Sequence, residues 1–102
     1  MKIEYPHKLP EQEAKERIRA LGEYLINRHG IGVTWNGDKA TIRGKYMVVS
    51  IEGTVTFQPG VVLFEGKDPG FLWRGKAKDY LTAKLTKYMN PETELAQLPR
   101  GA

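Results

Sequence analysis

The chain has 102 residues, which is enough for one domain with one modest core. It carries 16 Lys and Arg against 12 Asp and Glu, so its formal net charge is +4. The absence of Cys excludes a disulfide framework, a thiolate nucleophile and a Cys-based metal site. The single Ser, Ser50, lies between Val49 and Ile51, so the strand-turn-helix nucleophile of serine hydrolases is excluded as well.

The start of the chain is predicted to form a short strand followed by a long helix. Residues 3–5 alternate apolar and polar side chains, and Pro6 ends the strand. A helix is expected over residues 10–29, with Pro10 at its first position and Gly30 at its end. Its apolar side chains recur every three or four residues: Ala14, Ile18, Leu21 and Leu25.

After this helix the apolar period changes to two, which predicts a group of four strands over residues 31–35, 40–42, 46–57 and 61–65. Asn36-Gly37 is typical of a type I′ hairpin turn, and further turns are expected at Gly44 and at 58–60. Such tight turns favour an antiparallel meander with one covered face. Gly53 falls on the apolar side of the long strand, where it indicates a bulge or the close approach of a helix.

A second helix is expected over residues 71–89, ending before Asn90-Pro91. Its apolar positions again follow a helical period: Trp73, Ala77, Leu81, Leu85 and Tyr88. The predicted fold is a two-layer α+β domain over residues 1–90, with an antiparallel β-meander, two helices packed on one face and the order β-α-β-β-β-β-α. Residues 91–102 are predicted to form a polar, flexible tail outside the core.

The remaining polar residues give no pattern typical of catalysis. His7 and His29 are far apart and lack metal-ligand spacing. Glu13 and Glu16 are one turn apart but lie off the apolar face of their helix, and Glu52 has no nucleophile beside it. No glycine-rich phosphate loop follows a strand. We therefore expect no catalytic residue, no cofactor and no metal, and we interpret the protein as a non-enzyme.

The net charge is concentrated in the last helix. Residues 71–90 contain five basic residues against Asp79 alone: Arg74, Lys76, Lys78, Lys84 and Lys87. One flank of this helix combines basic and aromatic side chains and is a candidate surface contact: Trp73, Lys76, Tyr80, Lys84 and Lys87. A solvated basic rim on a core helix accounts for the same pattern.

Several short motifs occur in a recognisable order along the chain. They are Ile3, Pro6-His7-Lys8-Leu9, Glu13-Ala14, Arg17, Leu21, Leu25, Trp35-Asn36-Gly37-Asp38, Gly53 and Gly70-Phe71-Leu72. Over residues 3 to about 89 the chain resembles the small polyhydroxyalkanoic acid system proteins, also called granule-region proteins, of bacterial gene clusters for storage polymer. The resemblance implies a cytoplasmic protein of polyhydroxyalkanoate metabolism or of the granule surface, and it supplies no catalytic residue.

Three functions of different classes agree with these observations. The first is a non-catalytic accessory or binding protein of polyhydroxyalkanoate storage, in contact with the granule surface or a granule protein. The second is a carrier of small apolar ligands, with a cavity between sheet and last helix lined by Trp35, Phe57, Phe64 and Trp73. The third, and least favoured, is a nucleic-acid-binding regulator that uses the basic last helix. No apolar run approaches the ~20 residues that span a bilayer, and the oligomeric state stays open.

Overall fold

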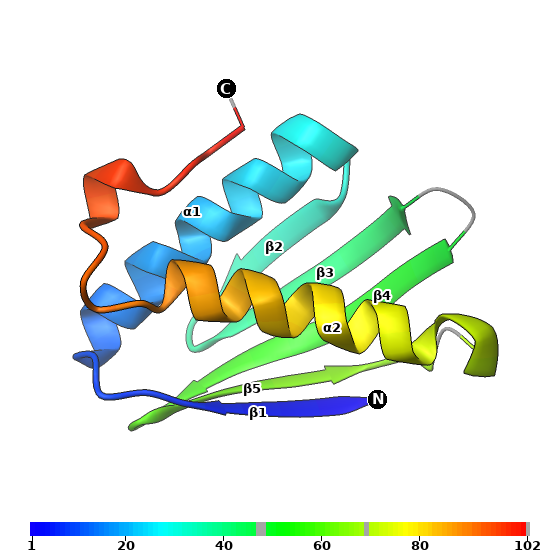
Figure 1. Ribbon diagram of the computed structural model, residues 1–102, viewed down its shortest axis with the longest axis horizontal. Helices are drawn as coiled ribbons and strands as arrows, with labels where there is room; N and C mark the ends of the chain where they lie inside the picture. The colour runs from blue at the N-terminus through cyan, green and yellow to red at the C-terminus, as the bar shows by residue number, and fades with distance from the viewer. Residues whose placement is uncertain (47–48, 69, 102) are drawn as a thin grey trace.

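A computed structural model describes residues 1–46, 49–68 and 70–101, and its backbone confirms the predicted α+β fold (Figure 1). Within these residues five strands form one antiparallel sheet: β1 (Lys2–Pro6), β2 (Gly32–Asn36), β3 (Lys39–Tyr46), β4 (Val49–Gln58) and β5 (Val61–Gly66). Two helices, α1 (Glu11–His29) and α2 (Phe71–Tyr88), cover one face of this sheet. A short 3-10 helix follows at Leu95–Gln97.

The strand order is β1-β5-β4-β3-β2, so the four later strands form the predicted meander. The first strand joins the meander at its far edge, beside β5, where Ile3 pairs with Phe64 and Tyr5 pairs with Val62. Because paired residues point to the same side of a sheet, this register places Ile3 on the face that the helices cover. Ile3 is accordingly buried in the core.

α1 lies on the sheet along the apolar face that its sequence predicted. Pro10 has an extended ψ of 146°, so the helix begins one residue later than predicted, at Glu11. Gly30 ends it in the left-handed conformation, with φ of 65°. All four predicted apolar residues are buried, and Arg17 is buried with them at 1% exposure. α1 thus packs on the sheet through its whole predicted apolar face.

α2 packs closely on its neighbours only through its C-terminal half. Leu85 and Tyr88 are buried in the core. Trp73, Ala77 and Leu81, nearer the start of the helix, are only half-buried. The helix therefore covers the sheet unevenly, with looser packing beneath its N-terminal half.

The β3–β4 connection differs from the sequence prediction. We expected a turn at Gly44, but β3 continues to Tyr46 and Gly44 pairs with Ile51 in β4. A Cβ atom on Gly44 would lie 2.9 Å from Cα of Ile31, so close backbone approach explains the glycine. The long strand predicted over 46–57 accordingly begins at Val49, and residues 47–48 lie outside the described residues.

The β2–β3 hairpin is also displaced by one residue from the prediction. Asn36 pairs with Lys39, so the two-residue loop is Gly37-Asp38 rather than Asn36-Gly37. Gly37 has a positive φ of 59°, which glycine tolerates without a steric cost. The carbonyl of Asp38 accepts the N–H of Phe57 at 3.0 Å, and this bond holds the loop against β4.

The segment after α2 lies along α1, although its polar composition predicted a tail outside the core (Figure 1). Leu98 is only 4% exposed and belongs to the core, and Leu95 packs against it. Asn27 of α1 donates to the carbonyl of Arg100 at 2.8 Å, and Arg100 pairs with Glu23 at 2.6 Å. Two leucines in an otherwise polar segment are a weak signal in the sequence. Because Leu98 is buried and Leu95 packs against the core, this segment is nevertheless attached to the domain.

Candidate functional site

A cavity of about 360 Å³ lies between the sheet and the N-terminal half of α2, and it is partly open to solvent. Its lining comes from the sheet, the end of α1 and α2: Met1, Leu25, Ile31, Ile42, Ser50, Ile51, Glu52, Phe64, Lys67, Trp73, Lys76, Ala77, Tyr80 and Leu81. Ligand-binding cavities in proteins commonly have volumes of about 300–1,000 Å³ and mainly apolar walls. This cavity meets both conditions, so we treat it as the candidate site.

The floor of the cavity depends on glycines in the sheet. Gly53 of β4 and Gly66 of β5 are paired, and Gly44 of β3 lies on the same inner face. A Cβ atom on Gly53 or on Gly66 would lie 2.7 Å from the ring of Phe64, so this ring covers both positions. Because Gly53 and Gly66 carry no side chain, the Phe64 ring lies close to the sheet, and this ring lines the cavity.

Gly53 therefore has a different role from either alternative that the sequence indicated. The β4–β5 pairing continues without a bulge through Gly53 and Gly66. Two groups approach Gly53, the side chain of Phe64 and the carbonyl of Glu65, and neither belongs to a helix. An aromatic ring that covers a strand glycine compensates for the packing which the missing side chain would have given.

The roof of the cavity is one face of α2. Trp73, Ala77, Tyr80 and Leu81 line it at the spacing of successive helical turns. Leu72, next to Trp73, points away from the core and is 73% exposed. The start of α2 therefore presents apolar side chains both to the cavity and to solvent.

An ionic contact holds the start of α2 against the end of the sheet. The Asp68 carboxylate accepts the N–H of Gly70 at 2.8 Å and Nε of Arg74 at 2.9 Å, and Nη2 of Arg74 lies 2.6 Å from it. The hydrogen bond from Arg74, followed by that from Gly70, holds the pKa of Asp68 below its usual value. The first turn of α2 is thus fixed to the loop after β5, beside the cavity.

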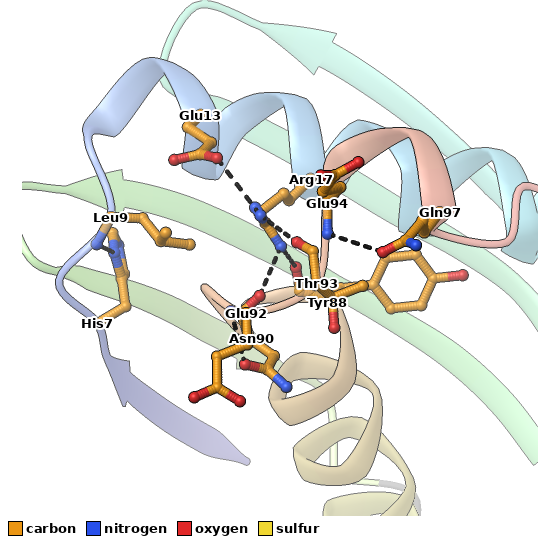
Figure 2. Close-up of polar contacts among 10 residues, drawn as sticks. All are labelled: His7, Leu9, Glu13, Arg17, Tyr88, Asn90, Glu92, Thr93, Glu94 and Gln97. Carbon is orange, nitrogen blue, oxygen red and sulfur yellow. Dashed lines mark hydrogen bonds and ion pairs between the residues drawn. The ribbon is translucent and has the colours of Figure 1, made fainter.

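Arg17 fixes the other end of α2, as Figure 2 shows. Its Nη1 donates to the carbonyls of Tyr88 and Asn90 at 3.1 and 2.9 Å, and its Nη2 donates to the carbonyl of Thr93 at 2.5 Å. Glu13 lies 3.4 Å from Nη2. The last carbonyls of a helix lack partners within the helix and attract cations, so a buried arginine is well placed here. Its contacts are all structural.

Sequence reasoning did not identify the role of Arg17, although a signal was present. Arg17 lies three residues after Ala14 and four before Leu21, and therefore within the apolar face of α1. A charged residue at such a position is unusual unless it has a buried partner. The partner comes from residues more than seventy positions later, which no local pattern reveals.

The structure separates the four aromatic residues that were predicted to line a cavity. Phe64 and Trp73 line the observed cavity. Trp35 and Phe57 stack on each other with ring centroids 5.7 Å apart, and the guanidinium of Arg19 lies 4.9 Å from the Trp35 ring. Neither of these two rings is part of the cavity lining, since they lie toward the opposite end of the sheet, near the β2–β3 loop.

The predicted basic and aromatic flank of α2 is also divided. Trp73, Lys76 and Tyr80 line the cavity, and Nζ of Lys76 lies 5.5 Å from the centroid of the Trp73 ring. Lys84 lies between the two helices, with its Nζ 4.2 Å from the centroid of the Tyr24 ring of α1 and 5.6 Å from that of Tyr80. Lys87 is exposed in the last turn. The flank therefore directs Trp73, Lys76 and Tyr80 toward the cavity and Lys84 toward the space between α2 and α1.

The polar side chains that β4 contributes to the lining lie on the outer face of the sheet. Among the described residues, no group of three or more His, Cys, Asp and Glu is placed to hold a metal ion. Ser50 and Glu52 alternate with the inward-facing Ile51, so their side chains lie on the outer face of β4. Consistent with this, Glu52 pairs with the exposed Arg43 at 3.7 Å. Nor does any helix in the described part have the length and apolarity needed to cross a membrane.

Comparison with known proteins gives one finding. The model of a family described as "putative polyhydroxyalkanoic acid system protein" matches residues 1–92. The chain belongs to this family. The match covers β1 to α2 and hence every residue that lines the cavity, and it agrees with the resemblance carried by the short motifs. No curated protein and no solved structure matches the chain.

Proposed function

We propose that this polyhydroxyalkanoic acid system protein is a non-catalytic binding protein that takes an apolar chain into the cavity beneath α2. The observation that carries the proposal is the cavity itself, whose walls are formed largely by aliphatic and aromatic side chains. Side chains around an empty space lack partner atoms on one side, and an apolar ligand supplies those contacts. A cavity of about 150 Å³ lined by Leu, Ile and Phe is enough to bind benzene. The larger volume here suits a longer chain.

The proposal combines two of the hypotheses from the sequence. Membership of the family supports a role in polyhydroxyalkanoate storage. The cavity supports the ligand-carrier mechanism, with Phe64 and Trp73 in contact with the ligand. The proposed role is binding without catalysis, because the inward-facing wall side chains include no nucleophile with an adjacent general base.

The fluorescence of Trp73 provides a direct test. In a Trp35→Phe variant Trp73 is the sole tryptophan, so its emission reports on the cavity alone. Titration with 1-decanol, a neutral alkyl chain, is expected to give a saturable change of intensity and a blue shift. The reason is that the chain displaces water from the ring.

A pair of substitutions on α2 supplies the control. Ala77 lines the cavity, so Ala77→Phe is expected to fill the space and abolish the decanol response. Ala83 is exposed on the same helix, so Ala83→Phe is expected to leave the response intact. A response that is absent from the parent variant, or equal in Ala77→Phe and Ala83→Phe, would show that the cavity is not the binding site.

A second candidate function, contact with the granule surface, is favoured by Leu72. This leucine is 73% exposed beside Trp73 and Lys76, and exposed apolar residues next to basic ones suit an apolar or anionic surface. Co-sedimentation with isolated granules is expected to decrease in Leu72→Asp, while the decanol response stays unchanged. Equal co-sedimentation of Leu72→Asp and the parent protein would remove this candidate.

A further inference from the structure

We propose that the ligand is an amphiphile with one alkyl chain and a carboxylate head, and that Lys67 and Lys76 bind this head at the mouth of the cavity. The inference rests on the proposed function, because the chain must occupy the cavity for the head to reach the two lysines. It adds a chemical class of ligand and names two residues that recognise it.

The charges around the cavity support an anionic head. The charged residues in its lining are Glu52, Lys67 and Lys76. The Glu52 side chain lies on the outer face of the sheet, where it pairs with Arg43 at 3.7 Å. Because Arg43 offsets the charge of Glu52, Lys67 and Lys76 give the charged side chains of the lining a net positive charge.

The neighbouring acidic residue does not neutralise either lysine. Asp68 follows Lys67 directly, but its carboxylate binds Arg74 and the N–H of Gly70. Within residues 1–46, 49–68 and 70–101, neither Lys67 nor Lys76 has a carboxylate within 4 Å of its ammonium group. Both lysines therefore retain their capacity to bind an anion.

Both lysines are also held near the opening. The N–H of Lys67 donates to the carbonyl of Glu52 at 2.8 Å, which fixes its main chain at the end of the sheet. Nζ of Lys76 lies 5.5 Å from the centroid of Trp73, a residue of the cavity roof, so this side chain lies along the roof. The lining thus receives one lysine from the segment after β5 and one from α2.

The kind of head group follows from the residue types. Arg43 and Arg74, which follow the lining residues Ile42 and Trp73 in sequence, are already paired with carboxylates, so neither guanidinium is free for a bidentate bond to a phosphate. Two lysines act as point charges and suit a compact anion. A volume of about 360 Å³ accommodates one alkyl chain rather than the two of a phospholipid. An alkanoate, with or without further hydroxyl groups, meets these requirements.

The test compares decanoate with 1-decanol, two ligands with the same chain and different heads. In Lys67→Met with Lys76→Met, the apolar stems are kept and the charges are removed. Decanoate affinity at low salt is expected to fall by about fivefold to tenfold, a range typical of two exposed charge contacts, while decanol affinity stays the same. Calorimetric titration measures both affinities, and circular dichroism checks that each variant is folded.

Two exposed lysines on α2 serve as the matched control. The double variant Lys78→Met with Lys87→Met removes the same charge from the protein but lies outside the cavity lining, and it is expected to bind decanoate normally. An equal loss in both double variants, or unchanged decanoate binding in the Lys67/Lys76 variant, overturns the carboxylate site. In either case decanol binding still supports the cavity proposal. Failure of both ligands to bind the parent protein overturns both proposals.

Discussion

Arg17 links three parts of the chain that are distant in sequence. It is buried on α1, and its guanidinium donates to main-chain carbonyls at the end of α2 and in the segment that follows (Figure 2). The two terminal nitrogens of this buried charge are satisfied by the carbonyls, whereas its buried Nε has no hydrogen-bond partner, and the carbonyls in turn depend on Arg17. The C-terminal end of the cavity roof is therefore positioned by one side chain.

Replacement of Arg17 is expected to destabilise the protein strongly. Arg17→Met keeps most of the apolar volume but leaves the carbonyls of Tyr88, Asn90 and Thr93 without their donor. A buried acceptor left without its donor typically costs about 1–3 kcal/mol, and three carbonyls lose their donor here, so we expect a loss of at least about 3 kcal/mol. Urea denaturation followed by circular dichroism measures the change in the free energy of unfolding.

Arg19→Met is the control on the same helix. Arg19 is exposed, and its contact is with the face of the Trp35 ring. Its replacement is expected to cost a small fraction of the loss in Arg17→Met. Equal losses for the two variants would contradict the anchoring role of Arg17.

Tyr88 makes the stability of the protein sensitive to alkaline pH. Its hydroxyl donates to the carbonyl of Pro99, and burial raises its pKa from 10.0 to about 12. The unfolded chain loses this proton at lower pH than the folded chain, so the contribution of Tyr88 is fully present below pH 10 and is lost as the pH rises toward 12. Comparison of the parent protein and Tyr88→Phe by urea denaturation at neutral and alkaline pH measures it. We expect a smaller alkaline decrease in Tyr88→Phe, and parallel decreases would count against this explanation.

At the scale of elements, the cavity exists because paired strands carry glycines where α2 packs loosely. Gly53 and Gly66 let the Phe64 ring lie close to the sheet, and the half-buried Ala77 leaves space above it. Larger residues at any of these positions would bring the two layers into contact through the space that is now empty. The space for a ligand thus depends on the sheet and α2 together, rather than on one sequence motif.

Gly53→Ala is expected to reduce the cavity and weaken ligand binding. The added Cβ would lie 2.7 Å from the Phe64 ring and 3.0 Å from the carbonyl of Glu65, so the ring must move, and the free space lies above it. We expect a loss of about 1–3 kcal/mol in the free energy of unfolding, as for overpacked cores, together with weaker decanol binding. Denaturation and Trp73 fluorescence measure the two effects.

Gly75→Ala is a matched substitution on α2. A Cβ atom there meets no atom within 4 Å, and alanine favours a helix over glycine by about 0.5–1 kcal/mol. This variant is expected to gain stability and to bind decanol as the parent does. If Gly53→Ala binds decanol as tightly as Gly75→Ala, the ring of Phe64 does not control the cavity.

Periodicity in the sequence was sufficient to predict the helices, the meander and the face that each element buries. It could not distinguish Gly44 as a point of close approach from a turn, because the atom that it meets belongs to Ile31 on another segment. Trp35, Phe57, Phe64 and Trp73 all lie on apolar faces, and for that reason the sequence placed all four at the cavity, but only Phe64 and Trp73 line it. Which of these rings line the cavity depends on how closely each part of α2 packs on the sheet, and no local sequence pattern encodes that packing.

At the scale of the whole molecule, α2 is fixed at both ends and loosely packed beneath its first half. The Asp68–Arg74 contact holds its start, and Arg17 with the segment after α2 holds its end. The family match includes both attachments up to residue 92, while the packed leucine Leu98 lies beyond it. A rigid sheet with a roof attached at two points provides a cavity without requiring either layer to unfold when a chain enters.

The central claim is that an alkyl chain binds between the sheet and α2, and intermolecular nuclear Overhauser effects test it most directly. Methyl-labelled protein mixed with decanoate is expected to show effects from the alkyl chain to Ile51, Ala77 and Leu81, which line the cavity. No effect is expected to Leu98, which is buried elsewhere in the core. Effects confined to the exposed Leu72, or none with any cavity methyl group at saturating decanoate, would contradict the claim.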